Sequence, residues 1–203
     1  MSENKKNRSS VETIRLGLVL ALYAMVSCAV LAVVSNLTGP KISQNQIDKA
    51  NAAMKAVVPE AESFEQIQDF AQGENKSIAI EKMYLAKKSE KVIGGTAQVS
   101  GPTYDRGTII VGMTVDGTVT GLQFLELTDS PGFGLKANDP TFTLPNGQTF
   151  YGQFNGKNAE QGFKAGVNFD AISGATITSN AIAGMISCGT SSMLKYFRGH
   201  DYE

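Results

Sequence analysis

Histidine and cysteine are scarce in this 203-residue chain, which has one His and two Cys. His200 stands alone near the C-terminus, and the Cys/His groupings that hold zinc or iron–sulfur clusters are missing, so we expect no metal site. Cys28 lies in a long apolar run and Cys188 in a predicted helix, and the two cannot pair if that run spans a membrane. Any redox chemistry would therefore need an organic cofactor.

The chain also lacks an excess of charge, with 18 Lys and Arg against 19 Asp and Glu and a formal net charge of −1. No basic cluster accompanies an aromatic platform, so we expect no nucleic-acid partner. A Gly-x-Gly-x-x-Gly turn in a βαβ setting is absent, which argues against NAD or FAD as primary cofactor. A Gly-x-Ser-x-Gly elbow is absent too, so a serine hydrolase using Ser173 or Ser179, with His200 as base, is the weakest alternative. We assign no catalytic residue.

One long hydrophobic run stands out near the N-terminus. Residues 16–37 contain no charged side chain, and roughly 22 residues at about 1.5 Å each suffice to cross a hydrocarbon core of about 30 Å. We predict a transmembrane helix over 16–37. A signal peptide has a shorter apolar region, and a lipoprotein acylated at Cys28 would continue into a polar tether, whereas 29–34 stays apolar.

Basic residues lie mostly before this run, which predicts a cytoplasmic tail over 1–15 and an extracytoplasmic remainder anchored by a single pass in the cell membrane. Lys5, Lys6, Arg8 and Arg15 precede it, and only Lys41 and Lys49 follow closely. We divide the rest into a juxtamembrane helix and connection over 38–76 and a main domain over 77–203. Gly39-Pro40 should end the span, and a helix packed on the domain should follow and stop at Pro59.

The main domain has the composition of strands followed by a helix. Ranges 78–86 and 92–99 form one predicted hairpin, and ranges 108–115 and 118–126 form another around Asp116-Gly117. An antiparallel meander explains this order as well as an internal duplication would, and we favour the meander. One short strand is possible within 60–76, turns and short strands are expected over 139–157, and a final helix is expected over 180–197. The predicted class is α+β, an antiparallel sheet with flanking helices behind one transmembrane helix.

The run from Asp170 to Ser179 occupies the junction before that final helix. The first N–H groups of a helix lack internal partners and favour an anion such as phosphate. Hydroxyls of Ser173, Thr176, Thr178 and Ser179 lie beside them, and Gly174 and Ala175 keep the backbone uncrowded. An ordinary N-cap would use the same residue types. Composition alone therefore leaves a phosphate site and a simple helix cap both open.

The same run, Asp-Ala-Ile-Ser-Gly-Ala-Thr over 170–176, resembles the flavinylation motif of FMN-binding domains. That motif, Asp-x-x-Ser/Thr-Gly-Ala-Thr, occurs in the G subunit of Rnf complexes and the C subunit of sodium-pumping NADH:quinone reductase. The resemblance implies that Thr176 carries FMN through a phosphoester, attached by a separate flavin transferase. It also implies recognition or positioning roles for Asp170 and Ser173 and an open approach to Thr176 at Gly174 and Ala175. Thr178 and Ser179 would form hydrogen bonds with the phosphate.

A second loop resembles another part of the family. Residues 129–134, Asp-Ser-Pro-Gly-Phe-Gly, are similar to its Glu-Thr-Pro-Gly-Leu-Gly loop, so Asp129, Ser130, Gly132 and Gly134 become expected flavin-binding residues. Tyr104 falls where relatives carry Gly-Tyr-Gly-Gly. Lys136 and Arg106 are candidate positive charges beside the flavin or, alternatively, solvated surface cations. The aromatic residues Phe142, Phe150, Tyr151, Phe154 and Phe163 are expected core anchors, one of which could flank the flavin.

The resemblance implies an electron-transfer protein of an ion-translocating Rnf complex, whose partners are other membrane subunits, rather than a stand-alone enzyme. The corresponding component of a sodium-pumping NADH:quinone reductase is the related alternative. A non-redox membrane-anchored binding module, with the Ser/Thr turn as a helix cap only, is the unrelated one. A pilin-like protein would also start with an apolar helix but has no use for the flavin motif.

Overall fold

The computed structural model describes residues 3–73 and 75–202 of the chain. The chain divides into two compact units, the first ending at Asp48 and the second running from Lys49 to the C-terminus. The described part of the first unit is helical, and the second unit contains all five strands of the described residues.

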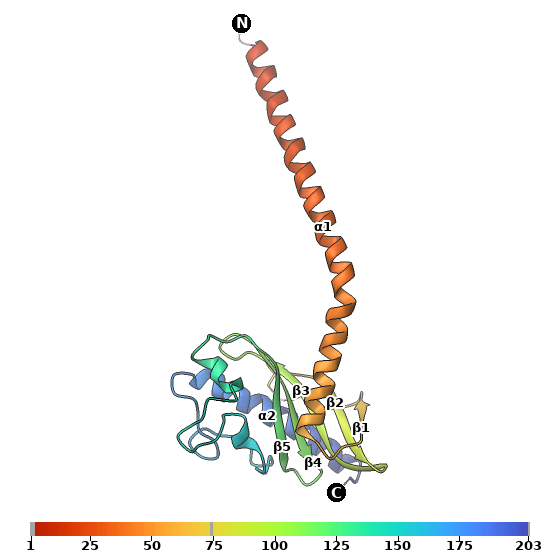
Figure 1. Ribbon diagram of the computed structural model, residues 1–203, viewed down its shortest axis with the longest axis vertical. Helices are drawn as coiled ribbons and strands as arrows, with labels where there is room; N and C mark the ends of the chain where they lie inside the picture. The colour runs from red at the N-terminus through yellow and green to blue at the C-terminus, as the bar shows by residue number, and fades with distance from the viewer. Residues whose placement is uncertain (1–2, 74, 203) are drawn as a thin grey trace. The chain divides into compact units, whose positions relative to one another are not determined.

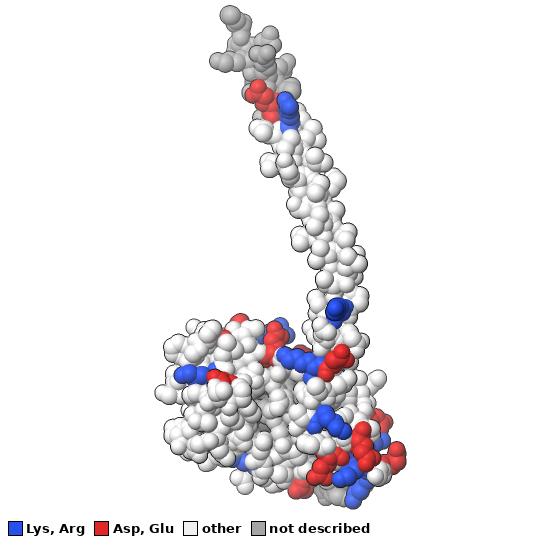
Figure 2. Space-filling view, viewed as in Figure 1, with Lys and Arg blue, Asp and Glu red and all other residues white. Residues whose placement is uncertain are grey.

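Helix α1 runs from Glu3 to Val57, so it begins in the first unit and ends in the second (Figure 1). Between Ile14 and Val57 it contains a window of mean hydropathy 2.5 with no buried residue. That length and composition are enough to cross a membrane. Figure 2 shows the corresponding stretch of helix free of charged side chains between its charged ends.

The expected break at Gly39-Pro40 is wrong, because α1 continues through Pro40. Proline removes one backbone N–H donor and is disfavoured inside a helix. The residues just before it, Ser35, Asn36, Thr38 and Gly39, are themselves weak helix formers, so local helix propensity does not explain the continuation. Thr38 Oγ1 also donates to the carbonyl of Val34 at 2.8 Å, on the turn just before the proline. The packed helix predicted before Pro59 is therefore the last part of α1.

A five-stranded antiparallel sheet in the order β1-β2-β3-β4-β5 forms the centre of the second unit (Figure 1). Its strands are β1 (Ser63–Ile67), β2 (Ala79–Lys88), β3 (Lys91–Gly101), β4 (Gly107–Thr114) and β5 (Val119–Leu127). Both predicted hairpins and the short strand before them are present, and each strand pairs with its neighbour in sequence. The α+β class and the meander are confirmed.

Two hydrophobic layers cover the two faces of this sheet. Helix α2, from Thr176 to Gly199, packs on β3 and β4, and its buried side chains share one core with Ile109, Val111 and Met113. The end of α1 covers the opposite face, where Met54 and Val57 join Ile110 in a second cluster. Successive residues of β4 alternate between the two clusters, so this strand is buried on both sides.

The segment between β5 and α2 is a long loop with two short 3-10 helices, η1 (Gly134–Asn138) and η2 (Gly152–Phe154). An aromatic cluster anchors it. Phe150 and Phe154 are fully buried, meet edge to face at 5.5 Å between ring centroids, and both contact Phe169. This anchored loop ends at the first turn of α2, and so it carries the motif of residues 170–176.

Candidate functional site

The first turn of α2 leaves its backbone N–H groups available. Ala175 occupies the N-cap position, and among the described residues no side chain caps this helix. The first i to i−4 bond is the one from Ser179 N–H to the Ala175 carbonyl at 3.0 Å. Helix α2 also begins at Thr176, four residues before the expected start, which makes Thr176 its first residue. The arrangement suits an anion better than a capped helix would.

A cavity of about 560 Å³, which we call the α2 cavity, opens at this turn. Its volume lies in the range usual for small-molecule and cofactor sites. Three segments distant in sequence form its walls, namely the loop before β4, the loop after β5 and the start of α2. The lining residues are Tyr104, Ser130, Pro131, Phe133, Gly134, Gly174, Ala175, Thr176, Ile177 and Thr178. None of them is charged.

Large apolar side chains surround the cavity. Tyr104 is 70% exposed, Phe133 58% and Ile177 61%, although side chains of this kind usually become buried. Gly174 adopts φ +79°, and a Cβ there would lie 3.5 Å from the Phe133 ring, so the backbone approaches this ring closely. An exposed apolar wall next to an uncapped helix start fits a ligand with a flat ring at one end and a phosphate at the other.

The three hydroxyls at the start of α2 have different surroundings. Thr176 is exposed and lines the α2 cavity. Thr178 also lines it, but its side chain is buried and its hydroxyl donates to Asp129 Oδ2. Ser179 is fully buried, accepts from the Ile172 N–H at 3.0 Å and donates to the Ala175 carbonyl at 2.9 Å. Thr176 is thus the hydroxyl best placed to react with a ligand.

Asp129, in the loop after β5, forms hydrogen bonds with the other two segments that make up the cavity walls. Its carboxylate is 2% exposed and accepts hydrogen bonds from Thr103 Oγ1 at 2.5 Å and from the Asp105 N–H at 2.9 Å. It also accepts from the Tyr104 N–H at 3.4 Å and from Thr178 Oγ1. It does not line the cavity.

Burial raises the pKa of Asp129, but the hydrogen bonds from Thr103, Thr178 and the two backbone N–H groups outweigh it and hold the pKa below its ordinary value. Asp129 is therefore ionised at neutral pH. Gly134 lies against the hydrogen bond between Asp129 and Thr178. A Cβ at Gly134 would overlap Asp129 and stand 2.7 Å from Thr178 Oγ1.

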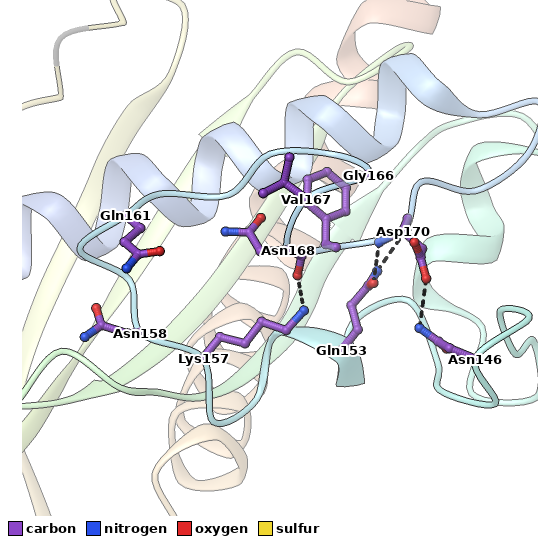
Figure 3. Close-up of a pocket in the computed structure, with 10 residues that line it drawn as sticks. Asn146, Gln153, Lys157, Asn158, Gln161, Gly166, Val167, Asn168 and Asp170 are labelled. Carbon is purple, nitrogen blue, oxygen red and sulfur yellow. Dashed lines mark hydrogen bonds between the residues drawn. The ribbon is translucent and has the colours of Figure 1, made fainter.

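Asp170 lies on a different cavity, the amide cavity, shown in Figure 3. Its carboxylate accepts from Asn146 Nδ2 at 3.1 Å, and its backbone exchanges two hydrogen bonds with the Gln153 side chain. Asn168 likewise bonds to the backbone of Gly162 and Lys164. These carboxamides hold the loop segments together, and Asp170 lines the amide cavity rather than the α2 cavity.

The remaining expected site residues lie outside the lining of the α2 cavity. Ser173 and Gly132 are exposed nearby, and Lys136 lies with its ammonium 5.2 Å from the centroid of the Phe142 ring. The structure therefore brings together Thr176, Gly174, Ala175, Thr178, Ser130, Gly134 and Tyr104.

Sequence reasoning missed Pro131, Phe133 and Ile177 as lining residues. Ile177 did carry a signal, since it is a large apolar residue within a run of small and polar ones. The five expected aromatic anchors are absent from the lining, and Phe150 and Phe154 among them are core residues.

Two family models match the chain. The model of the FMN-binding domain matches residues 105–188, which include both motif loops and most of α2. The model of the RnfG N-terminal region matches residues 4–57, which is nearly all of α1. The matched ranges thus cover nearly all of α1 and every residue that lines the α2 cavity except Tyr104.

Relatives match over most of their length. The chain is 30% identical over 181 residues to the G subunit of the ion-translocating oxidoreductase complex of Yersinia pestis, covering 83% of this chain and 84% of that one. It is 28% identical to the G subunit of the Na(+)-translocating ferredoxin:NAD(+) oxidoreductase complex of Acetobacterium woodii, covering 83% and 85%. It is 27% identical to the proton-translocating counterpart of Clostridium ljungdahlii, covering 87% and 88%. The protein is a membrane-anchored, FMN-binding-domain protein. It belongs to the G-subunit family of Rnf-type ion-translocating oxidoreductase complexes.

Proposed function

We propose that this protein is an electron-transfer subunit of an Rnf-type complex and carries FMN bound covalently through a phosphoester to Thr176. The observation that carries the proposal is the Thr176 hydroxyl, which is exposed, begins an uncapped helix and lines the α2 cavity. FMN, when bound, supplies one- and two-electron transfer, while the protein supplies orientation and electrostatics. The non-redox alternative needs a side-chain cap on α2, and no described residue provides one.

The charge of the cavity favours an ester over free FMN. A phosphate monoester carries about −1.5 to −2 charges at pH 7, and none of the ten lining residues offers a positive charge to balance it. Esterification by Thr176 leaves one negative charge, which the N–H groups of the first turn of α2 can stabilise. The ionised Asp129 behind the cavity disfavours the dianion further. Tight noncovalent binding of free FMN is therefore not expected.

The attachment is a phosphoryl transfer from FAD, catalysed by a flavin transferase. The Thr176 oxygen forms a bond with the phosphorus on the FMN half of FAD, and the bond from this phosphorus to the bridging oxygen breaks. AMP leaves with that oxygen. The proton of the Thr176 hydroxyl passes to a base of the transferase. Gly174 and Ala175 have small side chains and leave the approach to the Thr176 Oγ open. Asn146 and Gln153 hold Asp170, the first residue of the motif, in place by hydrogen bonds. Tyr104, Phe133 and Ile177 are the side chains available to contact the ring system.

The proposed setting is a cell membrane that α1 crosses once, with the tail over residues 1–15 in the cytoplasm and the FMN-binding domain outside. The support is the basic bias before the span, with Lys5, Lys6, Arg8 and Arg15 on that side. Other membrane subunits of the complex would be the electron donor and acceptor. A C-terminal alkaline phosphatase fusion should be active and a C-terminal cytoplasmic reporter inactive. The reverse pattern would contradict this orientation.

The test of the cofactor is intact-protein mass spectrometry of the full chain expressed with and without a flavin transferase. With the transferase, the mass should rise by that of FMN less water, and the added mass should localise to the peptide containing Thr176. The band on a denaturing gel should fluoresce. Thr176→Val, which keeps the shape of the side chain, should lose both signals.

Ser173→Ala is the matched control, because Ser173 belongs to the same motif but lies outside the lining of the cavity. It should keep the Thr176 linkage even if loading becomes slower. A flavin that persists on Thr176→Val, or wild-type protein that acquires no added mass, would refute the proposal.

A further inference from the structure

Asp129 places a negative charge behind the α2 cavity, and this charge would act on a bound flavin as well as on its phosphate. Asp129 is almost fully buried, and two of its four hydrogen-bond donors, Thr178 and the Tyr104 N–H, belong to residues that line the cavity. Its carboxylate is therefore one side chain away from any ligand there. Hydrogen bonds stabilise this charge but do not cancel it, and no lining residue carries an opposite one.

We propose that the buried Asp129 carboxylate lowers the reduction potential of the flavin in the α2 cavity, besides positioning the loops that form its walls. This inference rests on the proposed binding of FMN and assigns Asp129 as a positioning and electrostatic residue. Asp129 lies outside the lining of the cavity, so the proposed effect acts through its charge and not through a direct contact.

The physical reason is the charge that the flavin gains on reduction. Two electrons and one proton convert the neutral oxidised ring into an anion, so reduction adds one negative charge inside the cavity. A fixed carboxylate nearby repels that charge and favours the oxidised ring. For unit charges about 10 Å apart at an effective dielectric constant of about 20, the equilibrium changes roughly tenfold.

The surroundings of Asp129 preserve this effect. Salt and water screen exposed charges strongly but buried charges much less, and Asp129 is 2% exposed. Lys136 does not line the cavity, and its ammonium lies 5.2 Å from the centroid of the Phe142 ring. Asp105 offers a comparison within the same group of loops, because its carboxylate is exposed to solvent while its N–H bonds to Asp129.

The experiment is a redox titration of the FMN-loaded full chain with dithionite and mediators, followed by flavin absorbance. Asp129→Asn keeps the size and planarity of the side chain and removes the charge. It should raise the ratio of reduced to oxidised flavin at a fixed potential about tenfold, which is about 30 mV for a two-electron couple. Asp105→Asn removes one charge of the same sign from an exposed position and should change that ratio much less.

Thr103→Val separates the charge from the positioning role. Thr103 donates to Asp129 but does not line the cavity, so this variant loosens the same loop and removes one hydrogen-bond donor while leaving the carboxylate in place. Its flavin potential should equal or fall below that of the wild type. A merely structural role of Asp129 would instead shift Asp129→Asn and Thr103→Val in the same direction.

An unchanged potential in loaded Asp129→Asn would overturn the inference, and so would a raised potential in Thr103→Val, which remains decisive if Asp129→Asn does not fold. In the flavin-free protein, carbon-detected NMR should show the Asp129 carboxyl ionised throughout neutral pH, and a protonated carboxyl would equally overturn it. Wild-type protein that loads no FMN would contradict the proposed function instead, so the two failures are distinguishable.

Discussion

Three hydroxyls within one helical turn differ in what they can do because of their partners. Thr176 is exposed in the α2 cavity, Thr178 donates to the buried Asp129, and Ser179 bonds two backbone groups of the turn before the helix. All three were expected near a phosphate. The hydroxyl that is free to react and those that shape the site are distinguished by burial, which a run of residue types does not reveal.

Removing the Ser179 hydroxyl should destabilise the domain without removing a flavin ligand. Ser179→Ala leaves the buried Ile172 N–H without its acceptor, and an unsatisfied buried donor costs about 1 to 3 kcal/mol. Urea denaturation of the protein should show this loss. Ser173→Ala, at an exposed position, should stay within about 0.5 kcal/mol of wild type. Equal stability of the two variants would mean that the Ser179 bonds do not form.

Asp129 should also make stability depend on pH. Its pKa in the folded protein is held below the ordinary value of 3.8, so its stabilising contribution is complete above that value and disappears as pH falls through the folded pKa. Wild-type protein should therefore lose more unfolding free energy than Asp129→Asn when the pH is lowered from about 5 toward about 2. Denaturation midpoints at a series of pH values measure this, and parallel curves would contradict it.

The end of α1 acts as part of the domain, because it forms the hydrophobic cover of one sheet face. Val57 is 1% exposed and lies against Gly112 of β4 and Gly121 of β5, where an added Cβ would stand 3.0 Å from it. The two glycines allow the helix to approach the strands closely. Packing at this contact is therefore sensitive to volume on either side.

Truncating this contact should cost stability. Val57→Ala removes two buried methyl groups, which corresponds to about 2 kcal/mol when the transfer and cavity contributions are combined. Ala52→Ser, on the exposed side of the same helix, is the matched control and should have little effect. Thermal unfolding of both variants distinguishes them. A Val57→Ala protein as stable as the control would show that the end of α1 does not pack on the sheet in solution.

Elements with strong local signals could be predicted, and those that depend on distant contacts could not. The β-type composition of ranges 78–86 and 92–99, and of 108–115 and 118–126 around Asp116-Gly117, indicated the two hairpins, and both are present. Pro40 was wrongly expected to end α1. The helix continues through it although the residues just before it are mostly weak helix formers, so local preference alone misplaced the end of the helix.

The candidate site likewise has a part that the sequence predicts and a part that depends on distant contacts. The motif around Thr176 was visible in the sequence, but the burial of Asp129 depends on loops 26 and 49 residues away in the chain, at Thr103 and Thr178. Phe133 and Ile177 became lining residues for the same reason, since side-chain exposure at a cavity is a property of the folded loops.

At the scale of the whole molecule, the two compact units divide within α1, between Asp48 and Lys49, rather than at the end of that helix. The last turns of α1 contribute Ala53, Met54 and Val57 to the second hydrophobic cluster, which Val58 joins directly after the helix. The membrane anchor and the cover of the sheet are therefore consecutive parts of one helix. The folded domain begins before the helix ends.

This division predicts where the anchor can be removed. A fragment over residues 49–203 should fold cooperatively and remain soluble, because it keeps the α1 residues of the second cluster and lacks the apolar segment. A fragment over 60–203 removes Met54, Val57 and Val58, exposes Ile110 and Ala86 on the uncovered face, and should aggregate or unfold at a much lower temperature. Calorimetry and size-exclusion chromatography compare the two fragments. Equal melting temperatures would show that the sheet is stable without α1, whereas a large difference would locate the start of the domain inside the helix.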